Sequence, residues 1–189
     1  MTAPDARTSA THPIDVHWVP DLPTDGALGL TLAPGKHGPS YYDPIPWARD
    51  LDADLDRLRH HHGAEVLVSL MEDHEYDLLA IPDLRGRARD AGLEVRHFPV
   101  ADESVPPPWS DAAFAELVAG IRRALDGGRR VVVHCRGGVG RSGLVAAAIV
   151  TTYGDDADAA IARVRRAQRW AVETKEQEAY VARFAGQAG

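Results

Sequence analysis

The sequence contains a single cysteine, Cys135, among its 189 residues. One cysteine excludes a disulfide within the chain and a zinc site built from cysteines. Cys135 is therefore either a small buried side chain or a group with a chemical task, and its sequence context has to decide between the two.

A long hydrophobic run is also missing. The longest wholly apolar stretch, residues 144–150, falls far short of the roughly 20 residues that cross a bilayer. Residues 1–25 contain no apolar block followed by small residues, so they do not resemble a secretory signal. We therefore expect a cytoplasmic protein with no membrane partner.

The third absence is net positive charge. The formal net charge is −7, which argues against a nucleic-acid partner because such binding needs a broad cationic surface. Any anion site must then be local. The basic residues are nearly all arginine, with Lys36 and Lys175 as the exceptions, and alanine is abundant, which is typical of a GC-rich bacterial genome.

The length and the hydrophobic pattern predict one domain, residues 26–189, preceded by an extension. Residues 1–25 lack hydrophobic periodicity and are expected to form a loosely ordered extension or a wrapping strand. The patterns predict strands at 27–32, 65–70, 93–98 and 131–133, and helices at 51–58, 82–90, 111–125, 142–153, 157–168 and 174–185. This alternation predicts an α/β fold with a largely parallel central sheet flanked by helices.

Residues 131–143 contain the most informative pattern. An apolar strand without a polar face, residues 131–133, belongs in the centre of the sheet and places Cys135 at the edge where α/β folds bind ligands. The glycines that follow allow the loop to curl so that its N–H groups point inward, and the next helix adds its N-terminal dipole. The expected phosphate-binding residues are Arg136, Gly137, Gly138, Val139, Gly140 and Arg141.

The chemistry expected of this loop is phosphoryl transfer. The planar guanidinium of Arg141 can bind two phosphate oxygens in a fork. A cysteine at a helix N-terminus beside cations can have its pKa lowered from about 8.5 to roughly 3.5–7.5, so Cys135 is expected to be a thiolate. The thiolate can attack phosphorus and form a phosphocysteine, and Ser142 can donate a hydrogen bond to the sulfur as it leaves.

The run from His134 through Cys135 and Arg141 to Ser142, His-Cys-x-x-Gly-x-x-Arg-Ser, resembles the signature of the protein tyrosine phosphatase superfamily. The surroundings, including Pro34-Gly35-Lys36 and residues 98–102, resemble the dual-specificity-like branch with kinase-associated phosphatase and its bacterial relatives. The resemblance spans roughly residues 28–184. It implies a tyrosine phosphatase-like fold and hydrolysis of phosphotyrosine, with phosphoserine and phosphothreonine as further candidates, without metal or cofactor.

The resemblance also implies supporting residues. Asp102, in a proline-rich loop before the cysteine, has the place of the general acid, and Glu103 is its rival. The segment 171–177 resembles one that orients the hydrolytic water with two glutamines; here the first is replaced by Glu173 and Gln177 remains. His134 is expected to hydrogen-bond the loop and tune the thiolate.

The sequence is also compatible with other substrates and with a function in binding alone. The substrate could be a phosphoinositide or another non-protein phosphomonoester, although the loop carries only Arg136 as an extra cation. The domain could also bind phosphoproteins without hydrolysing them. Lys36 could help to bind a substrate at the rim of the site, but it is interpreted as an exposed loop lysine. Three aromatic residues are expected at the site entrance: Tyr41, Tyr42 and Trp109.

Overall fold

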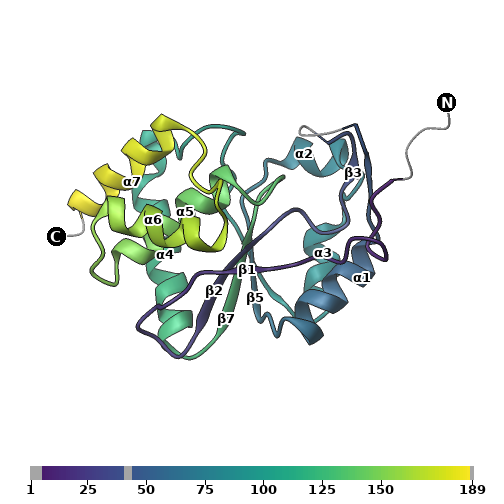
Figure 1. Ribbon diagram of the computed structural model, residues 1–189, viewed down its shortest axis with the longest axis horizontal. Coiled ribbons are helices and arrows are strands. Elements are labelled where there is room, and N and C mark those ends of the chain that lie inside the picture. Colours follow the sequence, from purple (N-terminus) through teal and green to yellow (C-terminus); the bar gives the residue numbers. More distant parts are fainter. Residues whose placement is uncertain (1–5, 41–43, 188–189) are drawn as a thin grey trace.

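A five-stranded sheet runs through the centre of the computed structural model, which describes residues 6–40 and 44–187 (Figure 1). Its strand order is β1 (His17–Trp18), β2 (Ala27–Thr31), β7 (Arg130–His134), β5 (Val66–Ser69) and β6 (Glu94–His97). The last four strands are parallel and β1 is antiparallel to β2. The predicted α/β fold with a largely parallel sheet is confirmed.

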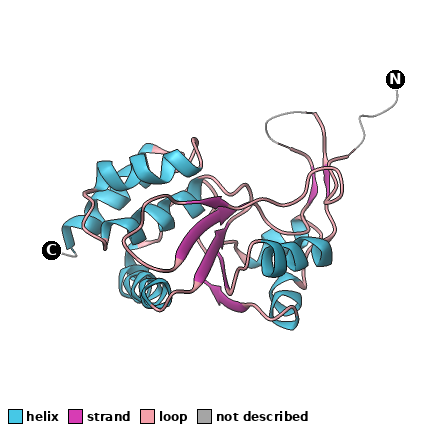
Figure 2. Cartoon of the chain, turned by 60° about the horizontal axis from the view of Figure 1, so that its bottom comes forward, coloured by secondary structure: helices cyan, strands magenta, loops and turns pink. Residues whose placement is uncertain are grey.

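Helices cover both faces of this sheet (Figures 1 and 2). One face carries α4 (Asp111–Asp126), α5 (Gly140–Thr151), α6 (Ala157–Ala167) and α7 (Lys175–Gln187). The other carries α1 (Leu51–Asp56), α2 (Asp73–Leu78) and α3 (Leu84–Asp90). Shorter elements are the π-helical turn η1 (Arg57–His61), the 3-10 turn η2 (Pro108–Ser110), and the two-stranded sheet of β3 (His37–Gly38) and β4 (Trp47–Ala48).

The position of β7 in the middle of the sheet explains why residues 131–133 are all apolar. Val131 and Val133 belong to the buried cluster that α4 to α7 complete, whereas Val132 belongs to the cluster on the side of α1 and α3. All three are fully buried, because a strand covered on both faces has no solvent side. None of the helices in the described ranges is long and apolar enough to cross a membrane.

The N-terminal segment is part of the packed structure. β1 pairs with β2 through His17 and Leu30, and the side chains of Ile14 and Val16 are buried. Further upstream, Arg7 forms a parallel bridge with Trp47 of β4. The prediction of a loosely ordered extension is therefore wrong for residues 6–25, and the alternative of a wrapping strand is the one observed.

The other predicted strands and helices are present with small changes of boundary, and one helix was missed. α2 follows β5 directly and begins with a capping box, in which the side chains of Glu72 and Glu75 each accept from the other's backbone N–H. α2 is only six residues long, which is too short for an apolar periodicity to reveal it.

Candidate active site

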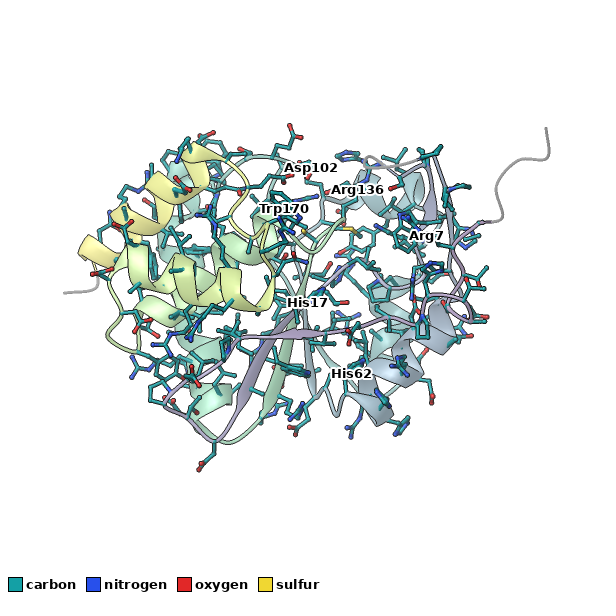
Figure 3. All side chains as sticks on the ribbon, in the orientation of Figure 1. Arg7, His17, His62, Asp102, Arg136 and Trp170 are labelled. Carbon is teal, nitrogen blue, oxygen red and sulfur yellow. The ribbon has the colours of Figure 1, made fainter. Side chains whose placement is uncertain are left out.

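The candidate site lies at the carboxyl edge of the parallel sheet. His134 ends β7, in register with Thr31 of β2 and Ser69 of β5, so Cys135 leaves the sheet between two neighbouring strands. Figure 3 places Asp102 and Arg136 at this end of the molecule, while His62 lies toward the opposite end. This is the edge at which open α/β sheets place their ligands.

The loop that follows Cys135 needs glycine at one position for steric reasons. Gly138 has φ of +74°, and a Cβ there would lie 2.5 Å from the carbonyl carbon of Thr31. A left-handed φ and a backbone atom at that distance exclude any side chain. The loop ends where α5 begins at Gly140, so Arg141 and Ser142 lie in the first turn of the helix.

Cys135 is almost fully buried as a residue, yet it contributes to the wall of a pocket of about 280 Å³. Its Sγ lies 3.5 Å from Oγ of Ser142, the distance of a hydrogen bond to sulfur. The loop residues Arg136, Gly137, Val139 and Gly140 line the same pocket. The sulfur that the sequence singled out therefore opens onto a cavity lined by its own loop.

His134 is wholly buried beneath this loop, and its Nδ1 lies 3.3 Å from the carbonyl oxygen of Cys135. Burial lowers the pKa of His134 to about 4, although this hydrogen bond opposes the shift. The imidazole is thus neutral at pH 7. Since a carbonyl only accepts, Nδ1 carries the proton and donates it to the loop backbone.

The guanidinium of Arg141 is held on the pocket wall by three hydrogen bonds to Glu75 and Val100. Glu75 accepts from Nη1 at 2.6 Å and from Nη2 at 2.8 Å, and the carbonyl oxygen of Val100 accepts from Nη1 at 2.9 Å. Nε of Arg141 is buried and has no hydrogen-bond partner within residues 6–40 and 44–187. An unpaired buried donor of this kind is costly, and a phosphate oxygen in the pocket would satisfy it.

Glu75 is the residue of this site that the sequence interpretation missed. Burial alone would raise its pKa, but the hydrogen bonds and the positive charge of Arg141 outweigh burial and lower it. Glu75 is therefore ionised and fixes the fork of Arg141 in one orientation. The pattern Glu72-x-x-Glu75 directly after a buried strand is the signal for a capped helix that could have revealed it.

Both candidate general acids line the pocket, but they differ in their contacts. A carboxylate oxygen of Asp102 lies 2.8 Å from Nη2 of Arg141, and it also accepts from the backbone N–H of Glu103 at 3.1 Å. Glu103 adopts φ of +56°, a strained conformation for a residue with a side chain. Asp102, and not Glu103, is therefore the carboxyl group that lies against the Arg141 guanidinium.

Gln177 is fully buried, and its amide is already engaged. Its Oε1 accepts from the backbone N–H groups of Glu173 at 2.8 Å and Thr174 at 3.3 Å, while Nε2 donates to the carbonyl of Ser104 at 3.2 Å. Gln177 thus ties the segment before α7 to the loop of Asp102. Glu173, rather than Gln177, is the residue of this segment that lines the pocket.

The surroundings of the pocket differ from the expectation in two places. Lys36 is only 8% exposed and lines the pocket, so its interpretation as an exposed loop lysine is wrong. Trp109 is 87% exposed and is not one of the pocket's lining residues, so its expected place at the entrance is wrong as well. The other two aromatic residues expected there, Tyr41 and Tyr42, lie outside the described residues.

Comparison with known sequences adds independent information. Residues 45–155 match the family described as "Polymorphic toxin system, DSP-PTPase phosphatase". Human cyclin-dependent kinase inhibitor 3 is 30% identical over 145 residues, which cover 76% of this chain and 64% of that protein. The pig protein of the same name is 27% identical over the same share. The match thus spans less than two thirds of the length of these relatives.

Solved structures show the same fold. A variant of kinase-associated phosphatase, with its catalytic-site cysteine changed to serine, matches with a TM-score of 0.80 and 24% identity, covering 93% of this chain and 96% of that one. Tk-PTP in its active form matches with a TM-score of 0.67 and 25% identity, covering 91% and 97%. PTPMT1 in complex with PI(5)P matches with a TM-score of 0.67 and 18% identity, covering 85% and 91%.

Proposed function

The chain belongs to the dual-specificity branch of the protein tyrosine phosphatase family, and from this we propose that it hydrolyses phosphotyrosine in proteins through a phosphocysteine intermediate. Phosphoserine and phosphothreonine are further candidate substrates. One observation carries the proposal: a single pocket is lined by Cys135, its loop, Arg141 and Asp102. A module that only binds phosphate has no need of a thiol and a carboxyl group in that pocket.

In the proposed first step the thiolate sulfur of Cys135 attacks phosphorus. The S–P bond forms while the bond from phosphorus to the ester oxygen breaks, and the carboxyl group of Asp102 gives its proton to the leaving oxygen. Loop N–H groups and the remaining N–H groups of the Arg141 guanidinium hold the phosphate oxygens throughout. The orphaned Nε of Arg141 is a donor available for this task.

In the second step a water molecule attacks phosphorus. The S–P bond breaks, the Asp102 carboxylate takes the proton of the water, and inorganic phosphate leaves. Ser142, 3.5 Å from the sulfur, donates a hydrogen bond to the departing thiolate of Cys135. Gln177 supports this step through its hydrogen bonds to the Asp102 loop and to the backbone of Glu173.

Turnover of p-nitrophenyl phosphate in the presence of EDTA tests the proposed chemistry. We expect activity without added metal, because the thiolate supplies the nucleophile and Arg141 the positive charge. A panel of peptides phosphorylated on tyrosine, serine or threonine then measures the substrate preference. If neither the aryl phosphate nor any peptide released phosphate, the proposed function would be wrong.

A phosphoinositide or another non-protein phosphomonoester is the second candidate substrate. The loop sequence contains Arg136 as its only extra cation, but Arg7 and Lys36 line the same pocket. Three cations beside the phosphate site suit a substrate with more than one anionic group. Phosphoinositides dispersed in detergent belong in the same panel, and release of phosphate from these alone would favour this candidate.

The acid role of Asp102 is testable through the leaving group. Asp102→Ala should lower kcat by roughly 10²–10⁴-fold for phenyl phosphate, whose leaving group needs a proton, and much less for p-nitrophenyl phosphate. Rates for a series of aryl phosphates measure this dependence. Glu103→Ala is the matched control and should keep the wild-type dependence; the opposite result would assign the acid to Glu103.

We also propose a partner and a location for the protein. A phosphoprotein or small phosphomonoester is the expected partner, with neither a nucleic acid nor a membrane. A cytoplasmic location in a bacterial cell is proposed from composition alone.

A further inference from the structure

Lys36 lies inside the candidate site, yet neither of the two proposed steps of phosphate hydrolysis uses its side chain. Its side chain donates from Nζ to the carbonyl oxygen of Arg136 at 3.2 Å, and Nζ lies 4.6 Å from the centre of the Trp47 ring. It lines the same pocket as Cys135 and Arg141. Lysine is one of the residues least often buried, so a lysine in this place calls for an explanation.

The contact with Arg136 acts on the backbone of the phosphate loop. The carbonyl oxygen of Arg136 accepts from Nζ of Lys36 and from the backbone N–H of Ala33 at 3.3 Å. In a planar trans peptide the C=O and the next N–H point in opposite directions. Holding this carbonyl toward residues 33–36 therefore turns the N–H of Gly137 to the other side of the loop, where a phosphate oxygen can accept from it.

The charged and titratable groups near Lys36 belong to several segments of the chain. Arg7 belongs to the N-terminal segment, Arg49 follows β4, and Cys135 and Arg136 belong to the loop. Three carboxyl groups and His37 line the same pocket. Those carboxyl groups are Asp102, Glu103 and Glu173. Arg49 is itself paired with Asp54, at 2.7 and 2.9 Å.

The ammonium group of Lys36 is therefore sensitive to pH. Burial lowers its pKa to about 8; the negative charge of Cys135 opposes this shift, and the positive charges of Arg49, Arg136 and Arg7 add to it. Lys36 is mostly charged at pH 7 and loses its charge as the pH rises through about 8. Among these charges, the interaction with Cys135 is the one that favours the charged form of Lys36.

We propose that Lys36 is a positioning residue of the phosphate loop, which holds the Arg136 carbonyl outward and adds its positive charge to that of Arg141 beside the thiolate and the bound phosphate. This inference rests on the proposed phosphatase function and names a residue that the signature sequence does not contain. It also gives the segment Pro34-Gly35-Lys36 a task at the active site.

Two variants of Lys36 distinguish the effect of its positive charge from the effect of its packing. In the wild type kcat/KM for p-nitrophenyl phosphate should fall above pH about 8, where Lys36 loses its proton. Lys36→Arg should keep the activity at pH 7 within a few-fold and retain it above pH 8, because arginine stays charged. Lys36→Met should raise KM at pH 7 roughly tenfold, since a charge-assisted hydrogen bond is lost.

Lys175→Met is the matched control, because Lys175 is the only other lysine and its side chain lies exposed on α7 next to Glu178. This variant should have the wild-type KM and pH profile. If the wild type hydrolyses the aryl phosphate and Lys36→Met has the same KM and pH profile, the role of Lys36 is refuted while the phosphatase function stands. If the wild type has no activity at any pH, the phosphatase function itself fails.

NMR of the folded protein labelled at the lysine ε-carbons tests the same inference without relying on a variant of Lys36. With two lysines in the chain, each signal can be followed through a pH titration. We expect one midpoint near 8 that falls in Cys135→Ser, where the sulfur's charge is gone, and rises when inorganic phosphate binds. A midpoint near that of free lysine, or one that Cys135→Ser and phosphate leave unchanged, would overturn the proposal.

Discussion

Cys135→Ser is expected to abolish turnover of p-nitrophenyl phosphate, with a loss on the order of 10⁴-fold or more. A serine hydroxyl stays protonated at neutral pH and is a far weaker nucleophile than a thiolate. The side chain keeps its size and its neighbour Ser142, so the fold should be unchanged. Steady-state kinetics and a thermal unfolding curve of the variant measure the two parts of this expectation.

The intermediate provides a second readout of the same step. Rapid acid quench of the wild type should trap a phosphate on Cys135, which mass spectrometry can assign without ambiguity because the chain has one cysteine. Ser142→Ala should still form this phosphocysteine but hydrolyse it more slowly, since the departing sulfur loses its hydrogen bond. Full activity of Cys135→Ser, or a wild type that binds phosphate without ever forming the adduct, would contradict covalent catalysis.

Arg141→Lys should lower kcat/KM by roughly 10²–10³-fold or more, the usual loss when a donor to the transition state is removed. A lysine ammonium is a point charge that cannot both pair with Glu75 in fork fashion and present a further N–H to the phosphate. The inhibition constant for inorganic phosphate should rise in parallel. Kinetics with and without phosphate measure both effects.

A remote arginine pair serves as control for this substitution. Arg163 forms a similar fork with Asp155, at 2.7 and 3.0 Å, away from the pocket, and Arg163→Lys should leave the kinetics unchanged. Glu75→Gln should lower kcat/KM as well and should cost about 3 kcal/mol of stability, because it leaves the buried guanidinium without its main counter-charge. Wild-type kinetics in Arg141→Lys would mean that this guanidinium does not hold the phosphate.

Local sequence patterns predicted the helices and strands correctly wherever these elements are long or wholly buried. Residues 131–133 have no polar side chain, and β7 is indeed the middle strand of the sheet. The spacing from Cys135 to Arg141 places the two residues at either end of one short turn that lines the pocket, because only five residues separate them in the chain. Such features depend on sequence neighbours alone, so the order of residues was enough to predict them.

Three features of the site depend instead on contacts between distant segments. Glu75 meets Arg141 across 66 positions of the chain, and Lys36 meets the loop carbonyl across 100. Arg7 comes to the same pocket only because the N-terminal segment pairs with β2 and β4. The capping pattern from Glu72 to Glu75 can indicate a helix, but no local pattern of these three residues indicates a contact with the phosphate loop.

The amino-acid order alone therefore predicted the α/β class, the position of Cys135 at the edge of the sheet and the arginine that shares its pocket. The packing of the chain decided how that arginine is oriented, which cations line the pocket with Cys135 and which carboxyl group lies beside the guanidinium. The physical reason is range: helix, strand and loop propensities act over a few residues, whereas the charges that tune this pocket are brought together only when the whole sheet has formed.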